Sequence, residues 1–186
     1  MTHPQLIPYL IDLDAYHRMI ETGILTEDDP VELIEGQIVT MSPKGSKHAA
    51  CLRKIMTWLP EAVGENAQIQ VQDPIQIPDL SEPEPDLALV QPRADYYAEA
   101  HPLPSDVTLL VEVADSSLRI DREIKAPVYA AADIAHYWII NLPEQQIELY
   151  AQPQGDRYQK LHTVQRGEMV SVPGLGIEVA VGDWLV

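Results

Sequence analysis

Cysteine is almost absent from this chain of 186 residues. The single cysteine, Cys51, has no partner within the chain, so an intramolecular disulfide cannot form. A zinc site built on several thiolates is excluded for the same reason. A chain of this length buries enough apolar surface to fold without such cross-links, and no repeat or linker divides it. We therefore expect one domain over residues 1–186.

Long hydrophobic runs are also missing. The longest apolar stretches, such as Val107 to Ala114, suit buried strands and are too short to span a bilayer. The first residues have no basic segment ahead of an apolar one, so they do not resemble a signal peptide. We expect a cytoplasmic protein that makes no membrane contact.

Basic residues are scarce. The chain has 12 Lys and Arg against 29 Asp and Glu, which gives a formal net charge of −17. Proteins that bind nucleic acid phosphates usually carry a basic surface, so this charge argues against tight nonspecific binding to DNA. Seven of the 12 bases lie in two groups, namely Lys44, Lys47, Arg53 and Lys54, and Arg119, Arg122 and Lys125. Each group is either a solvated helix face or part of a local basic surface.

Hydrophobic periodicity predicts an α/β fold. Helical spacing extends over residues 12–22, 46–62 and 118–132, and Pro127 is expected to kink the last helix. Glu35-Gly36 lies between two short apolar runs and predicts a β-hairpin. Strand patterns follow in AQIQVQDPIQI, DLALV, VTLLVEV, HYWIINL, QQIELYA, RYQKLHTV and the C-terminal tail. This order predicts a mixed central β-sheet flanked by helices, with an N-terminal hairpin and extra C-terminal strands.

Two carboxylates stand at unusual places in these strands. Asp86 opens the apolar run DLALV, and Glu112 interrupts VTLLVEV on the face that it shares with Leu110 and Ala114. Burying a carboxylate is costly unless it is paired or bound to a cation. Acids at the ends of adjacent strands would form an oxygen-ligand site suited to Mg²⁺. Taken singly, however, Asp86 could be a turn residue, and Glu112 could pair with a base on the next helix.

The segments around these acids resemble a known family. The pieces ELIEGQIV, SEPEPDLALV, HPLPSDVTLLVEVADSSLRIDREIKAPVYA and YWIINL are similar to the Uma-two family of restriction endonuclease-like proteins. The resemblance continues through IELYAQP and VPGLGIEV, so it covers nearly the whole chain. Members of this family are similar to nucleases of the PD-(D/E)XK fold. The resemblance therefore implies a restriction-endonuclease-like sheet and phosphodiester hydrolysis.

The resemblance also implies a role for four residues. Asp86 and Glu112 would hold one or two Mg²⁺ ions, for which Mn²⁺ can substitute. The superfamily usually has a lysine two residues after the second acid, where this chain has Ala114, and Lys125 on the following helix would replace it. Glu32 matches an accessory acid. Two simpler alternatives stay open: Lys125 could pair with Asp121 at i,i−4, and Glu32 could be an exposed acid on an edge strand.

Other residues could support such a site. Ser116, Asp121 and Tyr129 are candidates for orienting its side chains, although Ser116 could simply cap a helix. His48 could approach a phosphate, but a lone histidine at a helix start is more often solvated. Asp133 stands where the family usually has a glycine in a left-handed turn, a conformation that aspartate adopts at some cost.

Two functions compete at this stage. The first is a Mg²⁺-dependent endonuclease that hydrolyses phosphodiester bonds in DNA, acting as the homodimer that the resemblance implies. The second is a catalytically silent binding or regulatory module with the same fold, favoured by the acidity and by Ala114. A hydrolase for another phosphate ester is a weaker alternative. The position of the bases relative to Asp86 and Glu112 should discriminate between the first two.

Overall fold

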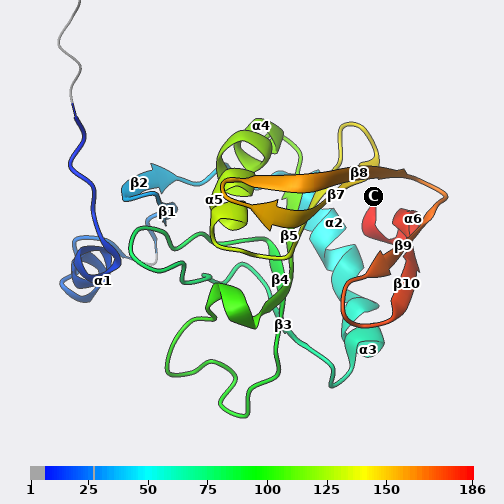
Figure 1. The fold of residues 1–186 in the computed structure, drawn as a ribbon, viewed down its shortest axis with the longest axis horizontal. Helices are drawn as coiled ribbons and strands as arrows, with labels where there is room; N and C mark the ends of the chain where they lie inside the picture. The colour runs from blue at the N-terminus through cyan, green and yellow to red at the C-terminus, as the bar shows by residue number, and fades with distance from the viewer. Residues whose placement is uncertain (1–6, 27) are drawn as a thin grey trace, which may run out of the picture.

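A six-stranded mixed sheet forms the centre of the protein (Figure 1). The computed structural model describes residues 7–26 and 28–186. The strand order is β3-β4-β5-β6-β7-β8, and every neighbouring pair is antiparallel except β5 and β6. The strands are β3 (Gln68–Gln70), β4 (Leu87–Val90), β5 (Val107–Ala114), β6 (His136–Asn141), β7 (Gln146–Gln154) and β8 (Arg157–Gln165). The predicted mixed sheet is confirmed.

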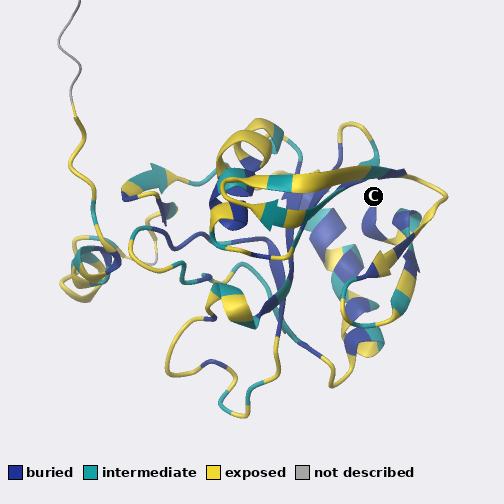
Figure 2. Cartoon of the chain, viewed as in Figure 1, coloured by how far each residue is buried: buried dark blue, intermediate teal, exposed yellow. Residues whose placement is uncertain are grey.

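Side chains of β5 alternate between two hydrophobic cores, one on each face of the sheet. Leu109, Val111 and Val113 belong to one core, and Leu110 and Ala114 belong to the other. This is the division that the alternating pattern predicts for a strand covered on both faces. Buried residues are accordingly concentrated in β4 and β5, at the middle of the molecule (Figure 2).

The first core lies beneath α2 and the C-terminal end of the chain. This layer contains α2 (Ser46–Met56), α3 (Leu59–Val63), β9 (Met169–Val172), β10 (Ile177–Ala180) and α6 (Val181–Trp184). One continuous helix over residues 46–62 was the expectation, and it is wrong because the helix is interrupted at Thr57 and Trp58. Pro60 explains the break, since proline has no N–H to donate and its ring crowds the preceding turn.

The second core lies beneath the connection from β5 to β6. This connection is helical from residue 118 to residue 131 but irregular, with α4 (Leu118–Ile120), a π-helical turn η2 (Asp121–Lys125) and α5 (Ala126–Ala131). The irregularity stands directly before Pro127, where a kink was predicted. The wider turn buries both Asp121 and Lys125. Asp133 then adopts the expected left-handed conformation, with φ at +58°.

The N-terminal part forms a small satellite beside the sheet. Helix α1 (Leu13–Glu21) is capped by Asp12, whose Oδ1 accepts a hydrogen bond from the Ala15 N–H at 2.8 Å. The hairpin of β1 (Val31–Ile34) and β2 (Gln37–Thr40) turns at Glu35 and Gly36, both with positive φ, as predicted.

The predicted strand over residues 67–77 is mostly wrong, because only β3 pairs with the sheet. The chain turns away at Gln72, where φ is +58°, and Pro74 lacks the N–H that a ladder needs. Among the described helices, none is both long and apolar enough to cross a bilayer.

Candidate functional site

Asp86 and Glu112 meet at the end of two neighbouring strands. Leu87 of β4 pairs with Val111 of β5, and this register brings the preceding Asp86 beside Glu112. The Asp86 N–H donates to Glu112 Oε2 at 3.2 Å, and the Val113 N–H donates to Asp86 Oδ2 at 2.9 Å. The two residues are only 8% and 4% exposed. Asp86 is therefore a buried neighbour of Glu112 and not a plain turn residue.

Lys125 reaches this pair from the π-helical turn η2. Its Nζ lies 2.9 Å from Glu112 Oε1 and 3.2 Å from Glu32 Oε2. The alternative pairing with Asp121 is not the one formed, because Asp121 Oδ2 accepts instead from Ser117 Oγ at 2.7 Å. The structure thus brings the predicted lysine to the second acid.

Glu32 lies on β1 but is not an exposed edge residue. It is 4% exposed, and its Oε2 accepts a hydrogen bond from the Glu84 N–H at 3.1 Å. Through Lys125, Glu32 joins the pair formed by Asp86 and Glu112. All four residues singled out in the sequence are therefore in one place. Tyr129 belongs there as well, because its hydroxyl donates to Glu112 Oε1 at 3.2 Å.

His48 was considered in the sequence only as a possible phosphate contact, and a solvated side chain was favoured, so its place beside Asp86 was not predicted. It is 8% exposed rather than solvated, its Nδ1 donates to the Val113 carbonyl at 2.9 Å, and its Nε2 lies 3.1 Å from Asp86 Oδ1. A signal was present in the sequence. His48 extends the buried stripe of α2, which continues through Cys51, Leu52 and Ile55 at helical spacing.

Burial and crowding shift the ionisation of these groups. Burial raises the pKa of Glu112 well above its usual value, although Lys125 opposes the shift. Burial also raises the pKa of Asp121 to about 6. Burial alone would raise the pKa of Asp86, but the neighbouring His48 holds it below its usual value. The site therefore has more carboxylates than its few positive charges can compensate.

A cavity of about 150 Å³ opens above these residues. Its walls come from the β1–β2 hairpin, residues 41–45, the start of α2, the end of β5 and the turn η2. Six carboxylates line it: Glu32, Glu84, Asp86, Glu112, Asp115 and Asp121. Only two lysines, Lys44 and Lys125, and the imidazole of His48 stand against them. Such an acidic cavity attracts cations and repels anions.

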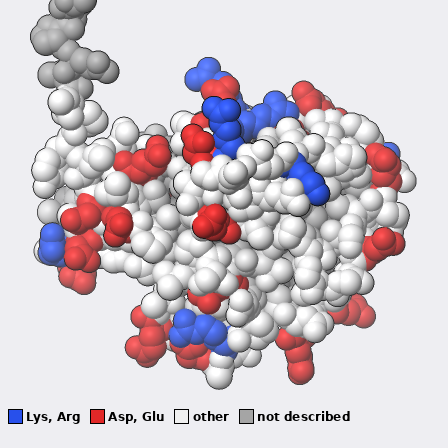
Figure 3. Space-filling view, in the orientation of Figure 1, with Lys and Arg blue, Asp and Glu red and all other residues white. Residues whose placement is uncertain are grey.

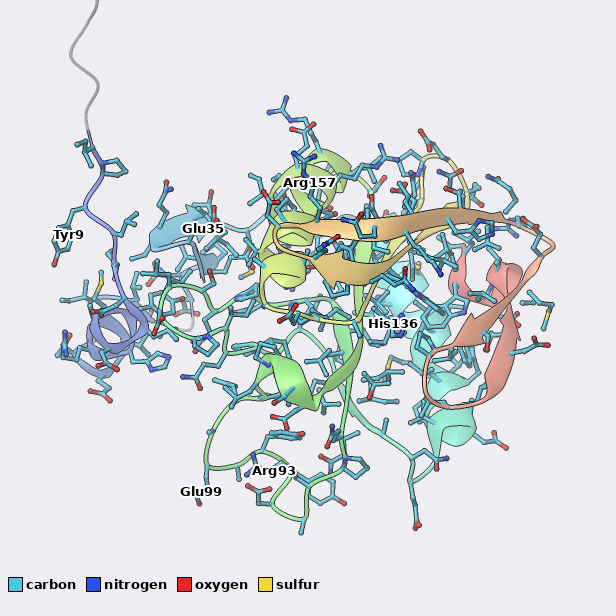
Figure 4. All side chains as sticks on the ribbon, viewed as in Figure 1. Tyr9, Glu35, Arg93, Glu99, His136 and Arg157 are labelled. Atoms are coloured by element: carbon cyan, nitrogen blue, oxygen red, sulfur yellow. The ribbon has the colours of Figure 1, made fainter. Side chains whose placement is uncertain are left out.

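Most other bases are engaged elsewhere. Arg122 pairs with Glu148, and Lys54 donates to the Gly182 and Leu185 carbonyls at 2.6 and 2.7 Å. On the face shown in Figure 3, most Lys and Arg atoms gather near the top, where Figure 1 places α4. Figure 4 shows Arg93 and Arg157 at opposite sides of the molecule, and neither residue lines the cavity. Apart from Lys125, the cavity has one basic side chain, Lys44.

The carboxylates retain room for a divalent cation. A carboxylate oxygen has two acceptor positions. Within the described part of the chain, three of these oxygens each accept one hydrogen bond. Asp86 Oδ1 accepts from Gln72, and Asp86 Oδ2 accepts from the Val113 N–H. Glu112 Oε2 accepts from the Asp86 N–H. Glu112 Oε1 is already used by Lys125 and Tyr129. The donor set fits a hard cation such as Mg²⁺, which takes one or two carboxylates and keeps several waters.

The ligands are nevertheless not preassembled. Over residues 7–26 and 28–186, no three His, Cys, Asp or Glu side chains are already gathered around one point as a metal group. The Lys125 ammonium, which lies between Glu32 and Glu112, occupies part of that space. Binding a cation would therefore require a small rearrangement of these side chains.

Comparison with known proteins identifies a family and a solved structure that are similar to this chain. The family model Uma2, described as "Putative restriction endonuclease", matches residues 13–182. A crystal structure of a "putative nuclease belonging to DUF820" from Anabaena variabilis aligns with a TM-score of 0.71 and 19% sequence identity. The alignment covers 94% of this chain and 97% of that one. Among curated proteins, none matches this chain.

Proposed function

The chain belongs to the Uma2 family, and we propose that it is a Mg²⁺-dependent endonuclease that hydrolyses phosphodiester bonds in DNA. The family description and the nuclease-like fold support a nuclease role. The choice of DNA as substrate and of Mg²⁺ as cation, with Mn²⁺ as a substitute, is part of the proposal. So is the homodimer, whose two sites would address two strands.

One observation carries the proposal. The Lys125 ammonium lies 2.9 Å from Glu112, and Glu112 is the neighbour of Asp86. The lysine reaches this pair although the position two residues after Glu112 is alanine. Two acids can hold a metal ion, and a lysine can stabilise charge on the phosphate, so these three groups suit metal-assisted phosphodiester hydrolysis. Helix and strand supply them to one cavity from different parts of the chain.

Each residue has a defined part in the proposed chemistry. When bound, a divalent cation supplies Lewis-acid chemistry, since it neutralises charge on the phosphate and lowers the pKa of a water. Asp86 and Glu112 would hold that cation. Lys125, as a permanent donor, would orient the attacking water or stabilise the charge that develops on the phosphate oxygens. Glu32 and Tyr129 fix Lys125 and Glu112 in place.

The acidity of the protein limits how it meets DNA. A net charge of −17 and a cavity with six carboxylates repel phosphates in the absence of cations. Lys44 at the cavity wall is the base best placed to contact the substrate backbone. We expect cleavage to depend steeply on the concentrations of both divalent cation and salt.

The experiment is cleavage of supercoiled plasmid at low salt with Mg²⁺ or Mn²⁺. Asp86→Asn keeps the shape of the side chain and removes its charge, so it should abolish nicking. Glu178→Gln removes an exposed carboxylate on β10, outside the cavity, and should leave nicking unchanged. Equal nicking by wild type and Asp86→Asn would reject the proposed site.

A catalytically silent module is the second candidate. The observation that favours it is Lys125 itself, which pairs with both Glu32 and Glu112 and so compensates their charge without a cation. In this alternative the four residues are a buried ion-pair cluster with a structural role. The protein would then bind a partner without turnover, and divalent cations would not change its stability.

A further inference from the structure

The imidazole of His48 has one committed nitrogen and one uncommitted nitrogen. Nδ1 must carry a proton, because its partner at 2.9 Å is the Val113 carbonyl, which only accepts. Nε2 is fully buried and makes no aligned hydrogen bond with any described residue. The residue His48 lines the same cavity as Asp86 and Glu112. A buried nitrogen without a hydrogen-bond partner is uncommon and calls for an explanation.

The nearest atom to this nitrogen explains the arrangement only in part. Asp86 Oδ1 lies 3.1 Å from Nε2. If the imidazole is neutral, two lone pairs face each other at this distance, and they repel unless a positive charge stands between or beside them. A proton on Nε2 is one such charge, although the N–H would be poorly aimed at Oδ1. A divalent cation bound by both atoms is the other.

The separation suits two ligands of one ion. Metal bonds of about 2.1 Å to an imidazole nitrogen and a carboxylate oxygen, at a right angle, place the two donor atoms about 3.0 Å apart. The Val113 carbonyl fixes the tautomer and the ring orientation, as a backbone carbonyl commonly does for a metal-bound histidine. Both features of a histidine ligand are therefore already built around His48.

We propose that His48 Nε2 is a third protein ligand for the cation held by Asp86 and Glu112. This inference rests on the proposed metal-dependent function and deepens it. The three donors are not yet gathered around one point, because Glu112 Oε2 accepts the Asp86 N–H. Glu112 must therefore rotate when the cation binds. Asp86 and His48 need little movement, since their facing atoms already lie at ligand spacing.

The proposed ligand set changes the expected metal. Two carboxylates alone suit Mg²⁺, whereas an imidazole favours first-row transition metals. A site with two carboxylates and one imidazole should bind Mn²⁺ more tightly than Mg²⁺, and His48 should contribute to that preference. Removing the imidazole should then cost more affinity for Mn²⁺ than for Mg²⁺.

A second histidine–carboxylate pair provides a matched control. His17 Nε2 lies 2.8 and 3.1 Å from the two carboxylate oxygens of the buried Glu82. In contrast to His48, its nitrogen has hydrogen-bond partners, and neither residue lines the cavity of Asp86. His17→Gln therefore tests the loss of a histidine near a buried carboxylate without touching the proposed centre.

The test is Mn²⁺ binding followed by electron paramagnetic resonance on the full chain. Titration gives the affinity, and electron spin echo modulation detects a nitrogen bound directly to Mn²⁺. Wild type and His17→Gln should show the nitrogen signal, and His48→Gln should lose it. His48→Gln should also weaken Mn²⁺ binding by about tenfold or more, a loss typical of disturbing a metal site, and Mg²⁺ binding by less.

The outcomes separate this inference from the proposed function. Mn²⁺ bound to wild type without a nitrogen signal, and lost in Asp86→Asn but kept in His48→Gln, would overturn the role of His48 alone. No Mn²⁺ binding by wild type would overturn both. The wild-type spectrum does not depend on the folding of any variant, so instability of His48→Gln would not obscure the answer.

Discussion

The Lys125 ammonium lies 2.9 Å from Glu112 Oε1, thirteen residues away along the chain. Only the short helix α4 separates the strand that carries Glu112 from the turn that carries Lys125, and the turn folds back over the end of the strand. Ala114 shares the face of Glu112 and has a small side chain. The lysine of the site is thus supplied by the crossover connection instead of by the strand.

Removing Lys125 should strongly destabilise the protein. Lys125→Ala leaves Glu32 and Glu112 buried without their shared cation, and breaking a buried ion pair costs about 3–5 kcal/mol. Urea denaturation at pH 8 measures the loss. Lys160→Ala, an exposed base on β8, should change stability by less than about 0.5 kcal/mol.

Lower pH or added Mn²⁺ should each restore part of the stability lost in Lys125→Ala. Protonation or a bound cation would then neutralise the uncompensated negative charge of the two buried glutamates. A variant as stable as wild type at pH 8 without metal would contradict the ion-pair account.

Asp121 should destabilise the fold above its own pKa. Its pKa is about 6 in the folded protein against 3.8 for an ordinary aspartate, mainly because of burial. The folded state therefore holds this proton more tightly than the unfolded state, and stability falls as pH rises from about 4 to 6. The penalty is complete above that range, at about 3 kcal/mol for about two pKa units.

Asp121→Asn should relieve this penalty. Asparagine can still accept from Ser117 but carries no charge. We expect a clear gain in the free energy of unfolding at pH 7.5 and almost none at pH 4, measured by urea denaturation at both values. A variant less stable than wild type at pH 7.5 would show that the charge of Asp121 is compensated in a way that burial does not predict.

Glu112→Gln should separate metal binding from folding. Burial raises the pKa of Glu112, so the fold tolerates a neutral side chain here, and Lys125 keeps Glu32 as a partner. Stability should change by no more than about 1 kcal/mol, while isothermal titration should show Mg²⁺ and Mn²⁺ affinity reduced by at least about tenfold. Retained affinity would remove Glu112 from the ligand set.

Lys44 should matter for substrate and not for metal. Among the described residues that line the cavity, it is the one Lys or Arg besides Lys125, and it is exposed. Lys44→Ala should raise KM for DNA and leave metal affinity unchanged. The slope of log affinity against log salt concentration should fall by about one, as expected for the loss of one phosphate contact. The neighbouring Lys47, exposed but outside the cavity, supplies the control Lys47→Ala. Equal effects of the two substitutions would point to a diffuse electrostatic contribution.

Part of this site was predictable because strand periodicity is strong. The alternation along VTLLVEV alone puts Glu112 on the face opposite to Val111 and Val113, which pack in the first core. The approach of Asp86 depends on strand register, and that of Lys125 on a π-helical turn. Local patterns specify neither feature, and it was the family resemblance that pointed to Asp86 and Lys125 as members of one site.

His48 shows why the rest was missed. Its burial follows from the face of α2 that packs on the sheet, but a polar residue at a helix start favours solvent when taken alone. Similarly, the alternation over residues 67–77 predicted a long strand, yet backbone geometry at Gln72 ends the pairing. In both cases tertiary contacts decided between two locally acceptable states.

The central claim is that Asp86 and Glu112 hold a divalent cation. The most direct measurement is anomalous X-ray scattering at the manganese edge from crystals of the wild-type protein grown with Mn²⁺. The account predicts a strong peak in contact with the carboxylates of Asp86 and Glu112. A peak confined to surface carboxylates, or no peak at saturating Mn²⁺, would contradict it.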